Sequence, residues 1–175
     1  ELTRDMGLGV KRRNEIEKRI NDNRAGRKHA AEELVKSNES ATDRNIFRYL
    51  LWQQQETSCP YCETKIGLHE AVNGNVTNID HIIPRSLTRV GRQRDHLVLA
   101  HRACNDEKGD RTPYDACGKT NPERWAIIDA HAKALEKKKF YTKARLLMLK
   151  DYEGEALDDA AIDGFSERQL QETSW

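Results

Sequence analysis

Two pairs of metal-binding residues constrain the fold of this chain more strongly than any other feature of its sequence. Cys59 and Cys62 are separated by two residues, and the same spacing separates His101 from Cys104. This spacing is typical of zinc knuckles, and two such pairs supply the three thiolates and one imidazole of a closed tetrahedral site. A closed site holds no water, so we predict a structural Zn²⁺ that adds several kcal/mol to the stability of a small core.

The cysteines also allow two other interpretations. The Cys-Pro-Tyr-Cys string at 59–62 occurs in redox dithiol sites, but such a site needs a βαβ unit in which the first cysteine opens a helix. Here a turn and short strands are expected to follow instead. Cys117 is the remaining cysteine. It is expected to be a free thiol, with the alternative that it binds the metal in place of His101.

A second group of residues points to phosphodiester chemistry. Asp80 and His81 lie in a β-branched run that ends at Pro84, and Asn105 directly follows the second knuckle. Neighbouring side chains on a strand point to opposite faces, so Asp80 and His81 can share a pocket only where the strand ends or twists. Pro84 supplies that interruption.

These residue types suit a metal-dependent nuclease centre. A neutral imidazole near pH 7 can accept a proton from water, which makes His81 the predicted general base. Mg²⁺ prefers oxygen ligands and typically takes only one or two from the protein. Asp80 and Asn105 are therefore its predicted ligands, and Mn²⁺ is expected to substitute for Mg²⁺.

Basic side chains close to these residues in the sequence are candidates for phosphate contacts. Lys108 lies one helical turn beyond Asn105. A run of arginines follows the predicted strand: Arg85, Arg89, Arg92 and Arg94. A phosphate-binding loop and a merely solvated basic loop both remain open here, and Arg85 and Lys108 are the predicted contacts. The net charge of +1 argues against a protein that holds nucleic acid by bulk positive charge alone.

The pattern of apolar residues predicts the elements that carry these motifs. A polar helical connector is expected over 11–36, followed by a helix over 43–55 that is capped by Thr42 and packs on the core. Short strands are expected at 76–83 and 97–99.

The second half of the chain is expected to be mainly helical. We predict a short helix after Asn105, a helix that starts at Pro122, its continuation or restart over 140–150, a loop over 151–163, and a last helix capped by Ser166. No apolar run approaches the ~18 residues that span a bilayer. Four cysteines without a secretory signal pattern suit a reducing, cytosolic setting.

These motifs resemble those of the HNH (ββα-metal, His-Me finger) endonucleases, and in particular the HNH region of the type II CRISPR RNA-guided DNA endonucleases. Four segments carry the similarity: 80–86, 98–99, 105–109 and 111–114. The paired knuckles resemble the compact, zinc-containing branch. Residues 1–5 resemble the second RuvC motif and residues 165–173 resemble the stretch that returns to the RuvC domain, so both ends look like cuts through a longer polypeptide.

The resemblance implies an α+β fold with a ββα-metal core around a structural zinc, flanked by helical linkers. It divides the chain into a RuvC-motif remnant and helical linker at 1–55, the HNH nuclease core at 56–120, and a helical extension that returns to the RuvC domain at 121–175. The implied substrate is the DNA strand paired to a guide RNA, cut to leave a 5′-phosphate and a 3′-hydroxyl. The implied partners are the RuvC and recognition domains of a parent effector in the cytoplasm of a prokaryote, and the isolated domain is expected to be a monomer.

Two positions depart from the family pattern. His96 stands where the family often has asparagine, and Asn78 stands where some members have a further acidic residue, which leaves metal binding to fewer oxygens. Two other functions also fit the motifs. One is a stand-alone HNH nickase or restriction-type endonuclease, and the other is a non-catalytic zinc module that only binds nucleic acid.

Overall fold

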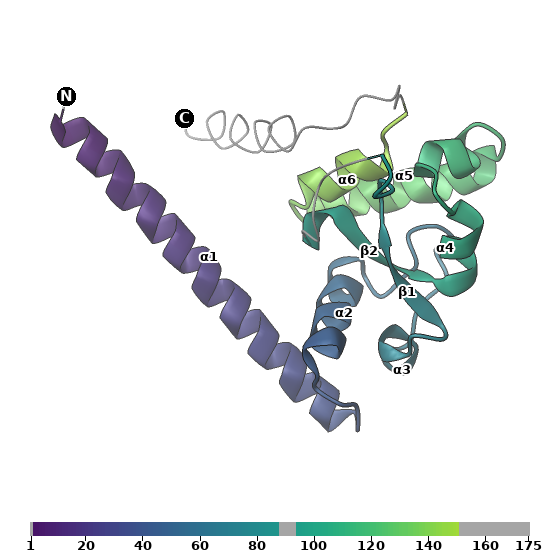
Figure 1. Ribbon diagram of the computed structural model, residues 1–175, viewed down its shortest axis with the longest axis horizontal. Helices are drawn as coiled ribbons and strands as arrows, with labels where there is room; N and C mark the ends of the chain where they lie inside the picture. Colours follow the sequence, from purple (N-terminus) through teal and green to yellow (C-terminus); the bar gives the residue numbers. More distant parts are fainter. Residues whose placement is uncertain (1, 88–93, 151–175) are drawn as a thin grey trace. The chain divides into compact units, whose positions relative to one another are not determined.

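The computed structural model describes the backbone of residues 2–87 and 94–150, with side chains from residue 9 onward (Figure 1). The chain forms two compact units, Glu1–Leu50 and Leu51–Trp175, and each is described by itself. None of the described helices combines the length and the apolar character needed to cross a membrane.

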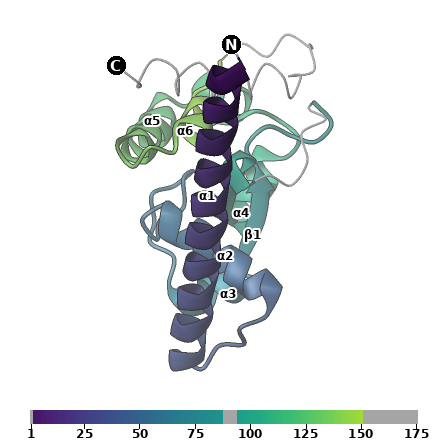
Figure 2. The ribbon, with the colours of Figure 1, turned by 90° about the vertical axis from the view of Figure 1, so that its left-hand side faces the viewer.

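The first unit is dominated by one long helix, α1 (Leu2–Lys36), which Figure 2 shows as an unbroken rod. The helix predicted over 11–36 is confirmed and begins nine residues earlier, at Leu2, while its role as a connector stays a prediction. Every side chain from residue 9 to residue 25 is exposed. A helix that buries nothing over that length needs no apolar stripe, which explains its polar sequence.

The end of α1 has a physical cause in the sequence. Asn38 adopts a left-handed φ of 58°, which asparagine tolerates better than most residues. The N–H of Asn38 then donates to the carbonyl of Val35, and the N–H of Glu39 donates to the carbonyl of Leu34 at 2.8 Å. This is the Schellman arrangement that satisfies the last carbonyls of a helix.

The helix α2 (Asp43–Gln54) spans the boundary between the units. Its predicted N-cap is confirmed, because the N–H of Asn45 donates to Thr42 Oγ1 at 3.2 Å. Within the first unit, Arg27 of α1 forms an ion pair with Asp43 at the start of α2.

The second unit is built on two antiparallel strands, β1 (Thr77–His81) and β2 (Leu97–His101). Both predicted strands are confirmed, although β2 extends two residues further than expected. The register pairs Thr77 with His101 and His81 with Leu97. The zinc-ligand candidate His101 and the catalytic candidates Asp80 and His81 therefore lie at opposite ends of the same ribbon.

The helix α4 (Arg102–Lys108) follows β2 without a loop (Figure 1). The predicted start of this helix, after Asn105, is wrong. His101 has an extended backbone at the N-cap, so the helix begins immediately after it and Asn105 lies within it. The helix ends at Lys108, and Gly109 caps it with a φ of +56°, which favours glycine.

Two short elements in the second unit were missed by the sequence analysis. These are α3 (Leu68–Val72) and the π-helical turn η2 (Tyr114–Gly118). Each has five residues, which is too short for a helical repeat of apolar positions to be visible. A 3-10 turn, η1 (Arg94–His96), precedes β2.

Two helices complete the described part of the second unit. Pro122 opens α5 (Pro122–Lys137) as predicted, and Asn121 caps that helix by accepting from the N–H of Arg124. The chain then restarts as α6 (Tyr141–Leu147). The predicted loop over 151–163 and the last helix, capped at Ser166, lie outside the described residues.

A buried glutamine joins the segment before the first knuckle to β2. The amide nitrogen of Gln55 donates to the carbonyls of Ser58 and Leu99, and its amide oxygen accepts from the N–H of Leu99 at 2.9 Å. These bonds hold the chain that leads into Cys59 against the strand that ends at His101. The two halves of the predicted zinc site are brought together in this way.

A buried lysine on α6, Lys143, is hydrogen-bonded to the last residue of α2. Lys143 is 0% exposed and its ammonium donates to Gln54 Oε1 at 2.8 Å. Burial lowers the pKa of Lys143 to about 7. The unfolded chain therefore binds more protons than the folded chain between pH 7 and the ordinary lysine pKa of about 10.4, and this group makes stability rise with pH across that window.

Lys143→Met is accordingly expected to stabilise the protein, because it removes a buried charge. We expect a gain of ~3 kcal/mol at pH 6 that falls below ~1 kcal/mol at pH 9, after allowing for the lost hydrogen bond to Gln54. Urea unfolding at several pH values measures this. The exposed control Lys133→Met should show no such pH dependence, and a pH-independent effect of Lys143→Met would contradict the prediction.

Candidate active site

The four predicted zinc ligands lie together in the structure. The ligand atoms of Cys59, Cys62, His101 and Cys104 are all within 4.8 Å of one another. Cys62 Sγ lies 3.3 Å from His101 Nδ1. Three sulfurs and one imidazole at this separation fit a closed tetrahedral Zn²⁺ site. Cys117 lies outside this cluster and donates from its thiol to the carbonyl of Pro113, so His101 is the fourth member.

The chemistry of the thiols also fits a metal that binds thiolates. The side-chain hydrogen bond from Cys104 is the main cause that lowers the pKa of Cys59 to about 5, although burial opposes it. The same hydrogen bond, together with burial, raises the pKa of Cys104. A Zn²⁺ bound here would hold each of these sulfurs as a thiolate.

The three catalytic candidates line one open pocket on the second unit. Asp80 and His81 contribute from the end of β1 and Asn105 contributes from α4. The strand ends at His81, three residues before Pro84, and this lets two consecutive residues face the same pocket. The exposed Arg85 also borders the pocket.

The carboxylate of Asp80 is buried and held at both oxygens. Asp80 is 7% exposed. Its Oδ2 accepts a hydrogen bond of 2.5 Å from the hydroxyl of Tyr61, and its Oδ1 accepts one of 3.1 Å from the ammonium of Lys108. Burial raises the pKa of Asp80, while the charge of Lys108 and both hydrogen bonds oppose that shift. Each oxygen keeps a further lone pair, so the carboxylate can still bind a cation.

Residues 59–114 match the family model described as HNH endonuclease. The chain contains an HNH endonuclease domain. The matched residues include all four members of the sulfur–imidazole cluster and the three catalytic candidates.

This chain is also similar to parts of much longer proteins. It is 31% identical over 126 residues to the CRISPR-associated endonuclease Cas9 1 of Streptococcus thermophilus, a match that covers 71% of this chain. It is 30% identical over 113 residues to the CRISPR-associated endonuclease Cas9 of Campylobacter jejuni, covering 65% of this chain. Each match spans only 11% of the relative.

Solved structures agree on the fold. A crystal structure of S. thermophilus Cas9 in complex with the GGAA PAM matches 93% of this chain and 18% of its own, with a TM-score of 0.67 and 19% identity. The Type II-C Cas9 enzyme from Actinomyces naeslundii matches 87% of this chain and 16% of its own, with a TM-score of 0.58 and 18% identity. The resemblance to Cas9 HNH regions and the predicted HNH fold class are therefore confirmed.

Lys108 of the HNH domain lies in a different environment from the one the sequence suggested. It was predicted to contact phosphate, yet its side chain is 4% exposed. Its ammonium donates to Asp80 Oδ1 and, at 3.0 Å, to the carbonyl of His81. Lys108 therefore holds the end of β1 against α4. A direct phosphate contact by Lys108 stays a prediction, as does one by Arg85.

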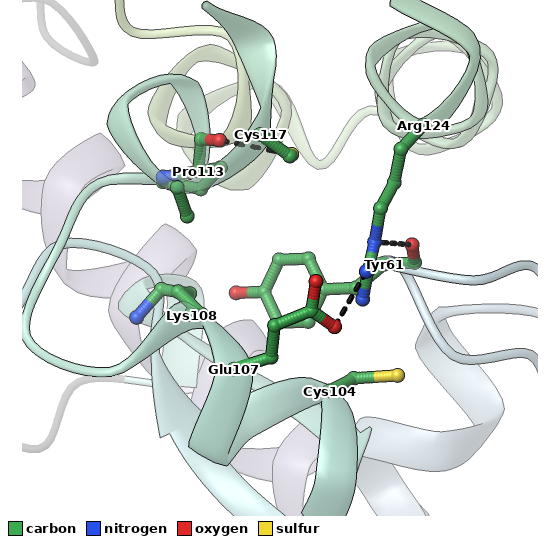
Figure 3. Close-up of a pocket in the computed structure, with 8 residues that line it drawn as sticks. Tyr61, Cys104, Glu107, Lys108, Pro113, Cys117 and Arg124 are labelled. Carbon is green, nitrogen blue, oxygen red and sulfur yellow. Dashed lines mark hydrogen bonds and ion pairs between the residues drawn. The ribbon is translucent and has the colours of Figure 1, made fainter. Parts of the chain in front are cut away.

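The sequence analysis missed one residue of this site, Tyr61. It lies between the knuckle cysteines, and the sequence suggested no role for its side chain beyond its place in the Cys-Pro-Tyr-Cys motif. Figure 3 shows its ring directed away from Arg124, with the hydroxyl on the side of Lys108. No local signal reveals this contact, because the partner of the hydroxyl is 19 residues away in the sequence.

The two positions that depart from the family pattern lie close to the strands. The backbone carbonyl of His96, in η1, accepts from the N–H of Ile82 at 3.1 Å, and His96 is buried. Asn78 pairs with Ala100 in the β1–β2 ribbon, two residues before Asp80. Their functional roles stay predictions.

Proposed function

We propose that this HNH domain cuts the DNA strand paired to a guide RNA by Mg²⁺-dependent hydrolysis, leaving a 5′-phosphate and a 3′-hydroxyl. The observation that supports this most is the single pocket lined by Asp80, His81 and Asn105 in a domain similar to part of Cas9. A buried carboxylate and an amide that line the same pocket supply oxygen donors that suit a hard divalent cation. Mn²⁺ accepts the same oxygen ligands.

In the proposed reaction His81 is the general base. Its imidazole would accept a proton from the attacking water, the role that a neutral imidazole plays in general-base catalysis. Asp80 and Asn105 would hold the cation, which when bound supplies neutralisation of the charge that develops on the phosphate and on the leaving oxygen. Tyr61 and Lys108 keep the Asp80 carboxylate in one orientation.

The sulfur–imidazole cluster has a structural role in this proposal. Zn²⁺ held by Cys59, Cys62, His101 and Cys104 would leave no open coordination position and take no part in the chemistry. It would hold the turn after α2 against the junction of β2 and α4, and Asn105 directly follows one of its ligands.

The substrate and partners follow from the similarity to Cas9. Base pairing with the guide RNA would supply the sequence specificity, while the domain acts on the backbone of the paired strand. The domain would work with the RuvC and recognition domains of a longer parent protein in the bacterial cytoplasm. In that parent, residues 56–120 would form the nuclease core, and residues 1–55 and 121–175 would contain the linkers.

A strand-resolved cleavage assay tests the proposal. The parent protein is loaded with guide RNA, and each DNA strand carries its own label. His81→Ala should abolish cutting of the guide-paired strand and leave cutting of the other strand intact, and the exposed control His29→Ala should behave as wild type.

Three outcomes would contradict the proposal. Equal loss of cleavage on both strands would show that His81 does not act selectively on the guide-paired strand. No loss on either strand would favour a module that only binds nucleic acid. Site-specific cutting of duplex DNA by this chain without RNA would favour a stand-alone nickase or restriction-type endonuclease.

A further inference from the structure

We infer that Tyr61 is a positioning residue through which the zinc knuckle orients the metal-binding carboxylate of Asp80. This inference rests on the proposed function and deepens it. It links two sites that the motifs present as separate: the sulfur–imidazole cluster that shapes the domain and the pocket where the reaction takes place.

The first support is the contact itself. The Tyr61 hydroxyl donates to Asp80 Oδ2 at 2.5 Å, and the two residues are 3% and 7% exposed. Water does not compete for such a buried hydrogen bond, and an unpaired carboxylate oxygen would be costly there. The carboxylate plane of Asp80 is therefore fixed by Tyr61 on one side and by Lys108 on the other.

The second support is the anchoring of Tyr61. It lies between Cys59 and Cys62, two members of the sulfur–imidazole cluster, so a metal bound there would restrain its backbone on both sides. The Tyr61 backbone is also held by a contact from α5, because Nε of Arg124 donates to the carbonyl of Tyr61 at 3.1 Å (Figure 3).

The third support is a bridge that ties this anchor to the catalytic helix. The guanidinium of Arg124, on α5, also pairs with Glu107 on α4 at 2.5 Å. Glu107 is adjacent to Lys108 in that helix. The knuckle, α5 and α4 are thus connected around the Tyr61 backbone, while the Tyr61 hydroxyl is bonded to Asp80.

The chemistry of the contact explains why a tyrosine serves here. A phenol donates one hydrogen bond without adding charge, so it orients the carboxylate and leaves its negative charge available for a cation. Groups that orient a metal-ligating carboxylate typically change metal affinity or activity by about 10–100-fold when they are removed. Phenylalanine fills nearly the same volume but lacks the hydroxyl, so Tyr61→Phe isolates this effect.

The test uses two measurements. In the parent protein with guide RNA, Tyr61→Phe should lower the rate of guide-paired strand cleavage by about 10–100-fold at limiting Mg²⁺ and raise the half-saturating Mg²⁺ concentration. In this chain without nucleic acid, Mn²⁺ binding followed by EPR should weaken by a similar factor. Zinc content should match wild type, and the cooperative thermal transition should persist at a lower midpoint, because the buried Asp80 Oδ2 loses its donor. The exposed control Tyr141→Phe should leave every quantity unchanged.

Other outcomes overturn the inference. Unchanged Mn²⁺ affinity in Tyr61→Phe would overturn it. Loss of bound zinc or of the cooperative thermal transition in Tyr61→Phe would also overturn it, because either loss would show a purely structural role for Tyr61. His81→Ala, assayed in parallel, separates this inference from the proposed function. If His81→Ala leaves guide-paired cleavage intact, the proposed function fails. If His81→Ala abolishes that cleavage while Tyr61→Phe behaves as Tyr141→Phe, the positioning role alone fails.

Discussion

Asp80→Ala is expected to destabilise this HNH domain by about 3–5 kcal/mol in addition to abolishing cleavage. The reason is the ammonium of Lys108, which is 4% exposed and lies 3.1 Å from Asp80 Oδ1. Removal of one partner of a buried ion pair leaves the other charge in a medium that solvates it poorly. The Tyr61 hydroxyl loses its acceptor at the same time. Urea unfolding of this chain measures the free-energy change.

A second substitution separates stability from catalysis. Lys108→Met in the Asp80→Ala background should recover most of the lost stability, because no buried charge then remains, but it should not recover cleavage. Asp129→Ala is the matched control, since Asp129 pairs with Lys133 on the exposed face of α5. That change should cost less than ~1 kcal/mol. If Asp80→Ala were no more destabilising than Asp129→Ala, the buried pair would not have the energetic role assigned to it.

Loss of the predicted zinc is expected to unfold the second unit. Structural zinc binding contributes about 10–16 kcal/mol in zinc-finger peptides at pH 7, whereas the net stability of a domain is only about 5–15 kcal/mol. Cys59→Ala should therefore abolish zinc binding and the cooperative thermal transition of the unit that begins at Leu51. Metal analysis and circular dichroism, with and without a chelator, measure both effects.

Cys117→Ser provides the matched control for this experiment. Its thiol lies outside the cluster and donates to the carbonyl of Pro113, a bond that a serine hydroxyl can also make. We expect one zinc per chain in this variant and none in His101→Ala. Full zinc content in His101→Ala together with loss of zinc in Cys117→Ser would show that the metal binds elsewhere.

The sequence alone determined the parts of this protein that depend on residue type and short spacing. Two ligand pairs with two residues between them predicted the sulfur–imidazole cluster. A strand that ends shortly after Asp80 and His81 predicted that both residues face one pocket, and Asn105 was placed with them by its position after a ligand. These features are visible because a knuckle and a strand end are local structures. The resemblance to HNH endonucleases depended on the same residues.

Only the tertiary structure decided which side chains surround the Asp80 carboxylate. Lys108 was predicted only as a phosphate contact, and the packing of α4 against β1 shows in addition that it is enclosed beside Asp80. Tyr61 meets Asp80 because Gln55 and the cluster bring the knuckle onto β2. The sequence favoured His101 as the fourth ligand, but excluding the alternative Cys117 required coordinates. Each of these facts depends on contacts between segments that are far apart in the sequence. The spacing of residues along the chain does not show which side chains will be buried against one another in the folded protein.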